Sequence, residues 1–466
     1  MSRYTSATDA DRAAMLKTIG VASVDELFAD IPEKLRLGRP LDLPAGLSEQ
    51  EVYAHLRELA ARNVSAADEI SFLGAGMYDH YVPALVDAIA LRSEFLTPYT
   101  PYQPEISQGG LQVMFEYQTA ISELTGLPVS NASVYEGPSA VGAAGYVART
   151  ANRRPKFLAS AGLHPHSLET LQTMSHGYGT EVVEVPLRDG ATDPDALGAA
   201  VDDDTGAVFL QQPNFLGAVE DLEALAPVAK ATGALLVVAC DPIPLALLRP
   251  PGECGADLAV GEGQPLGNRL DFGGPSFGFF AATEALLRRM PGRIAGETAD
   301  VDGRRGFVLT LQTREQHIRR EKATSNICTA QALNALCGMV YLAWLGRRGI
   351  VELAELVVQR TAYARETLGA LEGVSLLHEQ PVVREFALRL EAPAQRVRER
   401  CFEHGVDPGL PLADDGLLVA LTEQRSRADI DRLAEVLGAA VRESRTTAAP
   451  LVSASPDGER AGSGRA

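Results

Sequence analysis

The sequence predicts an α/β protein built around a mostly parallel sheet, because short β-rich runs alternate with helical patterns from residue 156 onward. The expected strands lie at 156–159, 181–185, 207–210, 235–240, 257–260 and 277–281. The helical patterns between them lie at 166–176, 195–201 and 222–232. In a sheet of this kind, ligands gather at the carboxyl ends of the strands.

The pattern changes at three places and divides the chain into four regions. These are an N-terminal helical arm at 1–65, a large domain at 66–330, a smaller C-terminal α/β domain at 331–445 and a disordered tail at 446–466. The arm carries amphipathic stretches but no core of its own, so it is expected to wrap another surface. The smaller domain begins with a long helix from about 330 to 344 and holds strands at 382–390 and 416–421. The tail is rich in Ser, Ala, Gly and Pro, which favours disorder.

The composition argues against several classes of protein. A net charge of −19 disfavours a nucleic-acid partner, since phosphate binding requires a basic surface. No apolar run approaches the roughly 20 residues that span a bilayer, and the first residues lack an apolar signal core, so a cytoplasmic chain without a membrane partner is expected. The five cysteines form no CxxC pair, which favours reduced thiols over a zinc site or a disulfide framework.

One loop, 99–109, carries polar side chains on a backbone that two prolines restrain. Tyr99, Tyr102, Gln103 and Glu105 lie in this loop directly before a helical pattern. Such a loop presents polar groups to a small ligand. It could equally be a proline-rich connection whose tyrosines pack on the fold, and the residue types alone do not decide between the two.

Three further segments resemble the large domain of a pyridoxal phosphate (PLP) enzyme. The turn 131–137 leads into a run of small residues, a pattern that suits an anion at a helix N-terminus. Asp241 ends the most hydrophobic run, where a carboxylate can pair with a pyridine nitrogen or cap the following turn. Glycines are dense at 255–267 and 272–275, which indicates close backbone approach to a ligand or to protein.

A PLP enzyme also needs a lysine some tens of residues after the strand-end aspartate, and none is present. The chain has five lysines, and no lysine lies between Lys230 and Lys322. Lys230 falls in a helical pattern ahead of the strand that carries Asp241. Without an amine in place the chain cannot hold PLP covalently, so no catalytic or cofactor-binding residue is assigned to it. His164 and His166 lack a further ligand cluster and are expected to be hydrogen-bonded turn residues rather than metal ligands.

At this point the sequence resembles subunit 1, the alpha subunit, of the glycine cleavage system P-protein family over nearly the whole chain to about residue 440. The motifs that carry the resemblance are Asp25-Glu-Leu-Phe28, Ser71-Phe-Leu-Gly-Ala-Gly76, His80-Tyr-Val-Pro83, Asn131-Ala-Ser133, the loop 99–109, the run 261–267, Phe272-Gly-Gly-Pro275 and, most specific, the run 312–329. Four positions depart from the family's pattern, namely Glu136, Pro138, Ala143 and Pro244.

The resemblance implies a fold-type I PLP-transferase-like architecture and a homologous subunit 2 (beta) that carries the lysine and holds PLP. Two alpha and two beta subunits would then decarboxylate glycine, pass the aminomethyl group to the lipoyl arm of the H-protein and release carbon dioxide. On this basis Tyr99, Thr100, Tyr102, Gln103 and Glu105 are expected to line a site shared across the subunit boundary. Weaker candidates for the same interface are Thr324, Ser325 and Asn326.

Three alternatives stay open. The chain could be a silent scaffold that only stabilises its homologous partner, or a self-sufficient PLP enzyme that uses Lys230 or Lys322. The arginine-rich stretches 288–293 and 314–320 could dock an acidic carrier, although solvated helix faces are the favoured interpretation.

Overall fold

The computed structural model describes residues 6–65, 68–271, 273–323, 325, 327 and 330–446. Two of the expected interface residues, Thr324 and Asn326, and the tail beyond residue 446 lie outside this range. The chain divides into two compact units, Met1–Val64 and Ser65–Ala466.

The first unit consists of short helices without a core. Its elements are α1 (Asp9–Ile19), η1 (Asp25–Phe28), η2 (Glu33–Leu35) and α2 (Glu49–Ala60). Reciprocal capping boxes begin both α-helices, Thr8 with Asp11 and Ser48 with Glu51. No side chain of residues 6–64 is buried, so these helices are held by local hydrogen bonds rather than by packing within the unit.

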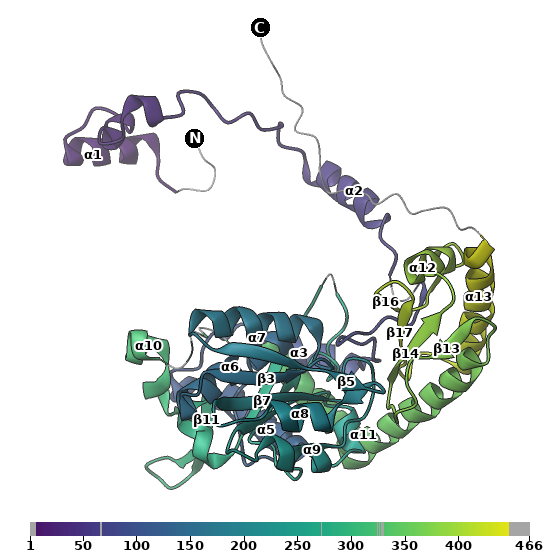
Figure 1. The fold of residues 1–466 in the computed structure, drawn as a ribbon. Helices are drawn as coiled ribbons and strands as arrows, with labels where there is room; N and C mark the ends of the chain where they lie inside the picture. Colours follow the sequence, from purple (N-terminus) through teal and green to yellow (C-terminus); the bar gives the residue numbers. More distant parts are fainter. Residues whose placement is uncertain are drawn as a thin grey trace. The chain divides into compact units, whose positions relative to one another are not determined.

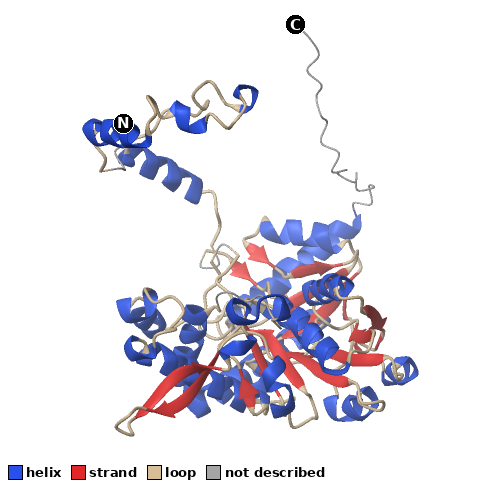
Figure 2. Ribbon diagram, turned by 90° about the vertical axis from the view of Figure 1, so that its left-hand side faces the viewer, coloured by secondary structure: helices blue, strands red, loops and turns tan. Residues whose placement is uncertain are grey.

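The second unit is organised around a seven-stranded sheet in the order β2-β10-β9-β8-β7-β3-β4 (Figures 1 and 2). Its strands are β2 (Val129–Ser130), β3 (Lys156–Ser160), β4 (Glu181–Val185), β7 (Thr205–Gln212), β8 (Leu235–Cys240), β9 (Leu258–Glu262) and β10 (Gly278–Ala282). The five strands from β4 to β9 are parallel, while β10 runs antiparallel to both of its neighbours. The mostly parallel α/β sheet that the sequence predicts is therefore present.

Helices cover both faces of this sheet because successive side chains of a strand point to opposite faces. Phe157 and Phe209 pack with α6 (Gly137–Asn152) and α7 (Pro165–Gly177) in one core. Their neighbours Leu158, Val208 and Leu210 pack in a second core on the other face. That second core includes residues of α3 (Ala84–Ala90), α5 (Gln108–Thr125), α8 (Pro194–Ala200), α9 (Leu222–Ala229) and α11 (Ala332–Gly369).

Shorter elements connect or flank this core. They are β1 (Ile70–Ser71), α4 (Ser93–Leu96), η3 (Pro104–Ile106), the hairpin β5 (Leu187–Arg188) with β6 (Ala191–Thr192), η4 (Pro244–Ala246), η5 (Glu284–Arg289), the hairpin β11 (Ile294–Ala299) with β12 (Arg305–Thr310), η6 (Gln312–Arg314), α10 (Gln316–Arg319) and η7 (Arg320–Lys322).

The C-terminal part of the unit is a four-stranded antiparallel sheet that follows the long helix α11. Its strands are β13 (Val374–Leu376), β14 (Glu385–Leu390), β16 (Leu410–Leu412) and β17 (Gly416–Ala420), with α12 (Ala394–Phe402), β15 (Val406–Asp407) and α13 (Arg427–Thr446) beside them. Helix α11 has a kink at Gly346, close to the predicted end at residue 344, and a second helical segment continues from there to Gly369. In the described part of the chain, no helix carries an apolar stretch of the length that a bilayer crossing needs. The division of this unit at residue 330 stays a prediction.

One close contact joins the two sheets of the second unit. Gly217, in the loop after β7, has φ +86°, and a Cβ there would lie 1.9 Å from the carbonyl oxygen of Glu385. Only glycine fits this approach. The neighbouring Ala218 forms an antiparallel bridge with Val382. The start of β14 is thereby held close to the carboxyl end of β7.

Candidate functional site

A cavity of about 730 Å³ lies at the carboxyl ends of the parallel strands. Four of these strands carry a polar side chain of the cavity lining, either at the end of the strand or in the loop after it. These are His164 after β3, Gln211 at the end of β7, Asp241 after β8 and Glu262 at the end of β9. The other walls come from the segment 74–78, the N-terminus of α6, and Arg384 and Glu385 at the start of β14. The topology thus gathers polar groups where an α/β sheet binds ligands.

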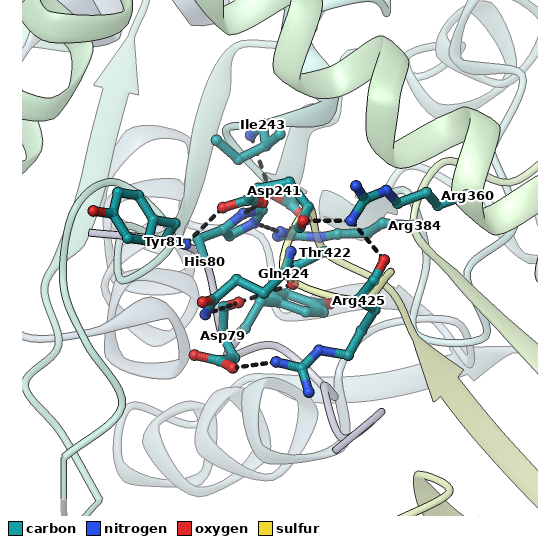
Figure 3. A network of polar contacts seen from close by, with 12 residues as sticks. Asp79, His80, Tyr81, Asp241, Ile243, Arg360, Arg384, Thr422, Gln424 and Arg425 are labelled. Carbon is teal, nitrogen blue, oxygen red and sulfur yellow. Dashed lines mark hydrogen bonds and ion pairs between the residues drawn. The ribbon is translucent and has the colours of Figure 1, made fainter. Parts of the chain in front are cut away.

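Arg384 and Asp241 form an ion pair in this cavity (Figure 3). The Arg384 side chain is 2% exposed, and its guanidinium lies 3.3 Å from the centroid of the Tyr78 ring, a cation–π contact. Asp241 also accepts a hydrogen bond from the amide of Ile243 at 3.1 Å, so it caps the following turn as well. The strand-end carboxylate is therefore already neutralised by an arginine of the same chain.

His80 connects Arg384 to a second carboxylate, and the geometry fixes its tautomer (Figure 3). Its Nε2 lies 2.5 Å from Nη1 of Arg384, and its Nδ1 lies 2.6 Å from Oε2 of Glu423. A guanidinium only donates hydrogen bonds, so Nε2 must be the acceptor. Nδ1 must then carry the ring proton and donate a hydrogen bond to Glu423. Burial alone raises the pKa of Glu423, but hydrogen bonds from His80 and the Tyr81 amide outweigh it and lower that pKa.

Glu385 is a buried acid that ties the segment 74–78 to β14. Its two oxygens accept hydrogen bonds from the Ala75 amide and the Tyr78 hydroxyl, each at 2.7 Å. Burial raises the pKa of Glu385 to about 7, although these two hydrogen bonds and Arg384 lower it. This carboxyl group consequently changes its charge near neutral pH.

Two carboxylates occupy the N-terminus of α6, where the sequence predicts an anion site. Glu262 accepts hydrogen bonds from the Gly137 amide at 2.9 Å and from the Ser276 hydroxyl at 2.8 Å. Glu136 caps the helix and accepts from the Ser139 amide at 2.8 Å. Negative charge at a helix N-terminus is favourable, so the chain supplies its own anions there. Burial raises the pKa of Glu262, and these hydrogen bonds oppose that effect.

The residues of this cavity do not fit PLP. The cofactor needs an amine, a carboxylate free to face its pyridine nitrogen and an open anion site for its phosphate. No lysine is among the described residues that line the cavity, and Asp241 is paired with Arg384. Glu262 already accepts the hydrogen bond of the Gly137 amide. Each of the three requirements fails for a separate reason.

Lys230 and Lys322 are the lysines nearest to Asp241 in sequence, one on each side, and both lie elsewhere in the second unit. The ammonium of Lys230 donates to Asp257 and to the carbonyl of Gly255, each at 3.0 Å. Asp257 precedes the first residue of β9, whereas the cavity lies at the other end of that strand. Lys322 lines a different pocket.

His164 is a hydrogen-bonded residue at the start of α7, as predicted. Its Nδ1 accepts from the His166 amide at 3.1 Å, so its Nε2 donates to the Ala75 carbonyl at 2.9 Å. Burial lowers the pKa of His164. Among the described residues, no group of three or more His, Cys, Asp or Glu side chains is placed to hold a metal ion.

The predicted loop 99–109 lies outside the large cavity, on the surface of the second unit. Tyr99, Tyr102, Gln103 and Glu105 are exposed, and Thr100 is half-buried. The loop is nevertheless firmly held, as its neighbours show. Tyr102 accepts a hydrogen bond from Arg293 at 2.9 Å and contacts the His317 ring edge-on, with 5.4 Å between ring centroids. Arg293 in turn pairs with buried Glu315 at 3.6 Å.

Gln108 fixes the other end of the loop. Its side chain donates to the carbonyls of Pro104 and Phe307 at 2.8 and 2.9 Å and accepts from the Phe307 amide at 2.9 Å. Ser325, the described member of the weaker candidates, is half-buried and caps the Ile327 amide at 3.1 Å. The structure therefore places the predicted loop beside the segment 312–317, on a rigid support.

Sequence reasoning identified Asp241, the turn 131–137 and the glycine-rich runs as one site, and the structure brings them together at the cavity. It missed Arg384, Glu385 and the segment 74–78. The available signal was the pair Arg384-Glu385 inside an otherwise apolar run, since consecutive charges at buried strand positions are rarely tolerated without partners.

Comparison with known proteins identifies relatives over nearly the whole chain. The family described as "Glycine cleavage system P-protein" matches residues 2–437. A "Probable glycine dehydrogenase (decarboxylating) subunit 1" of Carboxydothermus hydrogenoformans is 51% identical over 442 residues, which cover 94% of this chain and 99% of the relative. The protein of the same name from Geobacillus kaustophilus is 48% identical over 444 residues, covering 94% and 99%.

Solved structures extend the likeness to the fold. The crystal structure of an inhibitor-bound glycine decarboxylase (P-protein) superposes with a TM-score of 0.86 at 44% identity, covering 94% of this chain and 100% of that one. Glutamate decarboxylase of Lactobacillus brevis and sphingosine-1-phosphate lyase of Burkholderia pseudomallei give TM-scores of 0.68 and 0.64 at 14% and 17% identity. They cover 90% and 89% of this chain and show the fold alone. The fold is that of the fold-type I PLP enzymes, as predicted.

Replacing Arg384 by Met will lower the free energy of unfolding by about 3–5 kcal/mol, because it leaves the Asp241 carboxylate unpaired in the cavity. Arg389→Met, which removes an exposed arginine from the same strand, will cost less than about 1 kcal/mol. Urea denaturation of the purified chain measures both. The double variant Arg384→Met/Asp241→Asn is expected to recover part of the loss. A double variant as unstable as the sum of its two single variants would contradict the pairing.

The raised pKa of Glu385, about 7 against an ordinary 4.5, predicts a pH dependence of stability. The folded state keeps this proton where the unfolded state releases it, so the wild-type chain loses stability as pH rises toward and through 7. Relative to Glu385→Gln, the loss between pH 5.5 and 8 is expected to be roughly 2 kcal/mol. Urea denaturation at several pH values gives both curves. Parallel curves for the two proteins would contradict the assignment.

Proposed function

Because this chain belongs to the glycine cleavage system P-protein family, as a glycine dehydrogenase (decarboxylating) subunit 1, we propose that it works only together with a homologous subunit 2. That second subunit carries the lysine and holds PLP. The pair decarboxylates glycine, passes the aminomethyl group to the lipoyl arm of the H-protein and releases carbon dioxide. Two alpha and two beta subunits form the cytoplasmic assembly.

The cavity of this chain is the observation that carries the proposal. It lies where a fold-type I enzyme binds its cofactor, yet it contains no lysine and its charges are satisfied from within. PLP, when bound by the partner, supplies the electron sink for loss of carbon dioxide. This chain's own residues then serve to orient glycine and to exclude water at the subunit boundary.

The loop 99–109 is the part of this chain that we assign to the shared site. Tyr102 and Glu105 are exposed in the isolated chain, while Arg293 bonds the Tyr102 hydroxyl and Gln108 bonds the Pro104 carbonyl. A rigid loop with exposed hydroxyl and carboxylate groups is already organised for a partner or substrate, so little entropy is lost when it is covered. Ser325, with Thr324 and Asn326, belongs to the same proposed boundary.

The exposed apolar side chains of the first unit support the proposal of an obligate partner. Its helices bury none of their side chains among residues 6–64, and large apolar residues such as Phe28, Leu43 and Leu56 are about half exposed or more. Apolar surface of this extent marks an interaction site. We propose that the arm covers part of the subunit interface, which is expected to exceed roughly 2,000 Å² for a permanent pair.

The proposal is tested by assaying glycine–bicarbonate exchange with each subunit alone and with the co-expressed pair, PLP being present throughout. Exchange is expected only for the pair. Borohydride reduction of this chain with PLP, followed by mass spectrometry, should give no stoichiometric lysine adduct, since neither Lys230 nor Lys322 faces the cavity. Exchange by this chain alone, or a stoichiometric adduct on it, would falsify the division of roles.

Substitutions in the loop distinguish a chain that contributes to the active site from a chain that only stabilises its partner. Tyr102→Phe and Glu105→Gln are each expected to lower turnover of the assembled complex by about tenfold or more, because they remove groups that orient the substrate. Glu435→Gln on the exposed side of α13 is the matched control and should leave turnover unchanged. If both loop variants assemble normally and retain full turnover, the loop is only a support.

A further inference from the structure

The structure brings the two arginine-rich stretches of the sequence into one pocket. A pocket of about 350 Å³ is lined by Arg288 and Arg289 of η5, Arg314 of η6, Arg319 of α10 and Lys322 of η7. Among the described residues, the rest of its lining is Tyr146 and Thr150 of α6, which add two hydroxyl groups. The pocket lies within the second unit and shares no described residue with the larger cavity. Helix α10, which carries Arg319, is labelled in Figure 1. Five cations and two hydroxyls therefore face one small space.

With the described residues, these five cations form no close ion pair, although the neighbouring Glu315 carboxylate raises the pKa of Arg314 against the larger effect of burial. In the part of the chain that the structure describes, no carboxylate oxygen lies within 4.0 Å of any of their nitrogens. Ion pairs are otherwise common in the molecule, and the chain as a whole carries a net charge of −19. Glu315 adjoins Arg314 and Glu321 adjoins Lys322 in the sequence, but neither belongs to the described lining of the pocket. This pocket instead concentrates positive charge, whose mutual repulsion an anion would relieve.

Arg314 shows that the pocket is more than a patch of flexible surface charges. It is buried, and its terminal nitrogens are fixed by the carbonyls of Met290 and of Gly292, the latter at 3.0 Å. Its Nε is buried and has no hydrogen-bond partner. Burial also lowers the pKa of Arg314. An unpaired, desolvated guanidinium donor is costly unless a bound acceptor compensates it.

The geometry points to a binding site for a small molecule that carries a diphosphate group. A phosphoryl group brings close to two negative charges and three strong acceptors, whereas one carboxylate brings a single charge. One arginine guanidinium can donate two parallel hydrogen bonds to two oxygens of a phosphate. The hydroxyl groups of Tyr146 and Thr150 add further donors to the pocket. The volume, about 350 Å³, lies in the range of small-ligand sites. A concave pocket favours this compact anion over the broad acidic face of a carrier protein.

The test is calorimetric titration of the purified full-length chain with inorganic pyrophosphate at fixed ionic strength. Saturable binding at one site is expected, and the affinity should fall as salt rises. Arg289→Gln/Arg319→Gln should weaken binding at least tenfold. Arg304→Gln/Arg348→Gln removes the same charge from exposed positions elsewhere and should leave the affinity unchanged. Melting curves verify that both double variants are folded.

Three outcomes overturn the inference. They are no saturable binding of pyrophosphate, equal weakening in the two double variants, and a pocket variant that keeps pyrophosphate affinity but loses affinity for the partner subunit or the carrier. A parallel titration with ADP identifies the source of the diphosphate, since tighter binding of ADP than of pyrophosphate adds a nucleoside to the ligand. Because binding is measured on this chain alone, the result does not depend on the proposed division of the decarboxylase.

Discussion

The buried contact between Arg384 and Asp241 is the constraint on which the second unit depends. Two charges are removed from water there, a change that is unfavourable unless each meets a partner of good geometry. The contact meets that condition because His80 and the Tyr78 ring surround the guanidinium. It also joins the carboxyl end of β8 to the first residues of the C-terminal sheet, so the cavity and the packing of the two sheets are determined together.

The same contact shows how this fold satisfies its strand-end carboxylate within the chain. In a fold-type I enzyme, the strand-end aspartate and the helix N-terminus are satisfied by the ligand. Here Arg384 satisfies Asp241, and Glu262 satisfies the N-terminus of α6. The strand-end carboxylate and this helix N-terminus are thus satisfied by the chain itself, whereas Nε of Arg384 is buried without a hydrogen-bond partner among the described residues.

The sequence predicted the features that depend on local order. Runs such as Leu235–Cys240 are apolar and β-rich over a strand's length, and their alternation with helices determines a parallel sheet. Asp241 could be recognised because it ends such a run. Arg384 could not, because its role depends on a contact between residues far apart in the chain. The kink of α11 at Gly346 lies close to the predicted helix end at residue 344, where a glycine with φ +62° interrupts the helix.

Acidic and basic side chains gather at different pockets of the second unit. Acids gather in the large cavity, where Glu262 and Glu385 replace what a ligand would supply, and both have raised pKa values because of burial. Arg384 lines that cavity but is paired with Asp241, whereas the cations without a close ion pair occur around Arg314, at a pocket that shares no described residue with the cavity. An acidic protein keeps such a cluster unpaired only at an energetic disadvantage, because neighbouring carboxylates would otherwise stabilise it. A positive pocket with a fixed, buried guanidinium is therefore better explained by a ligand than by solubility.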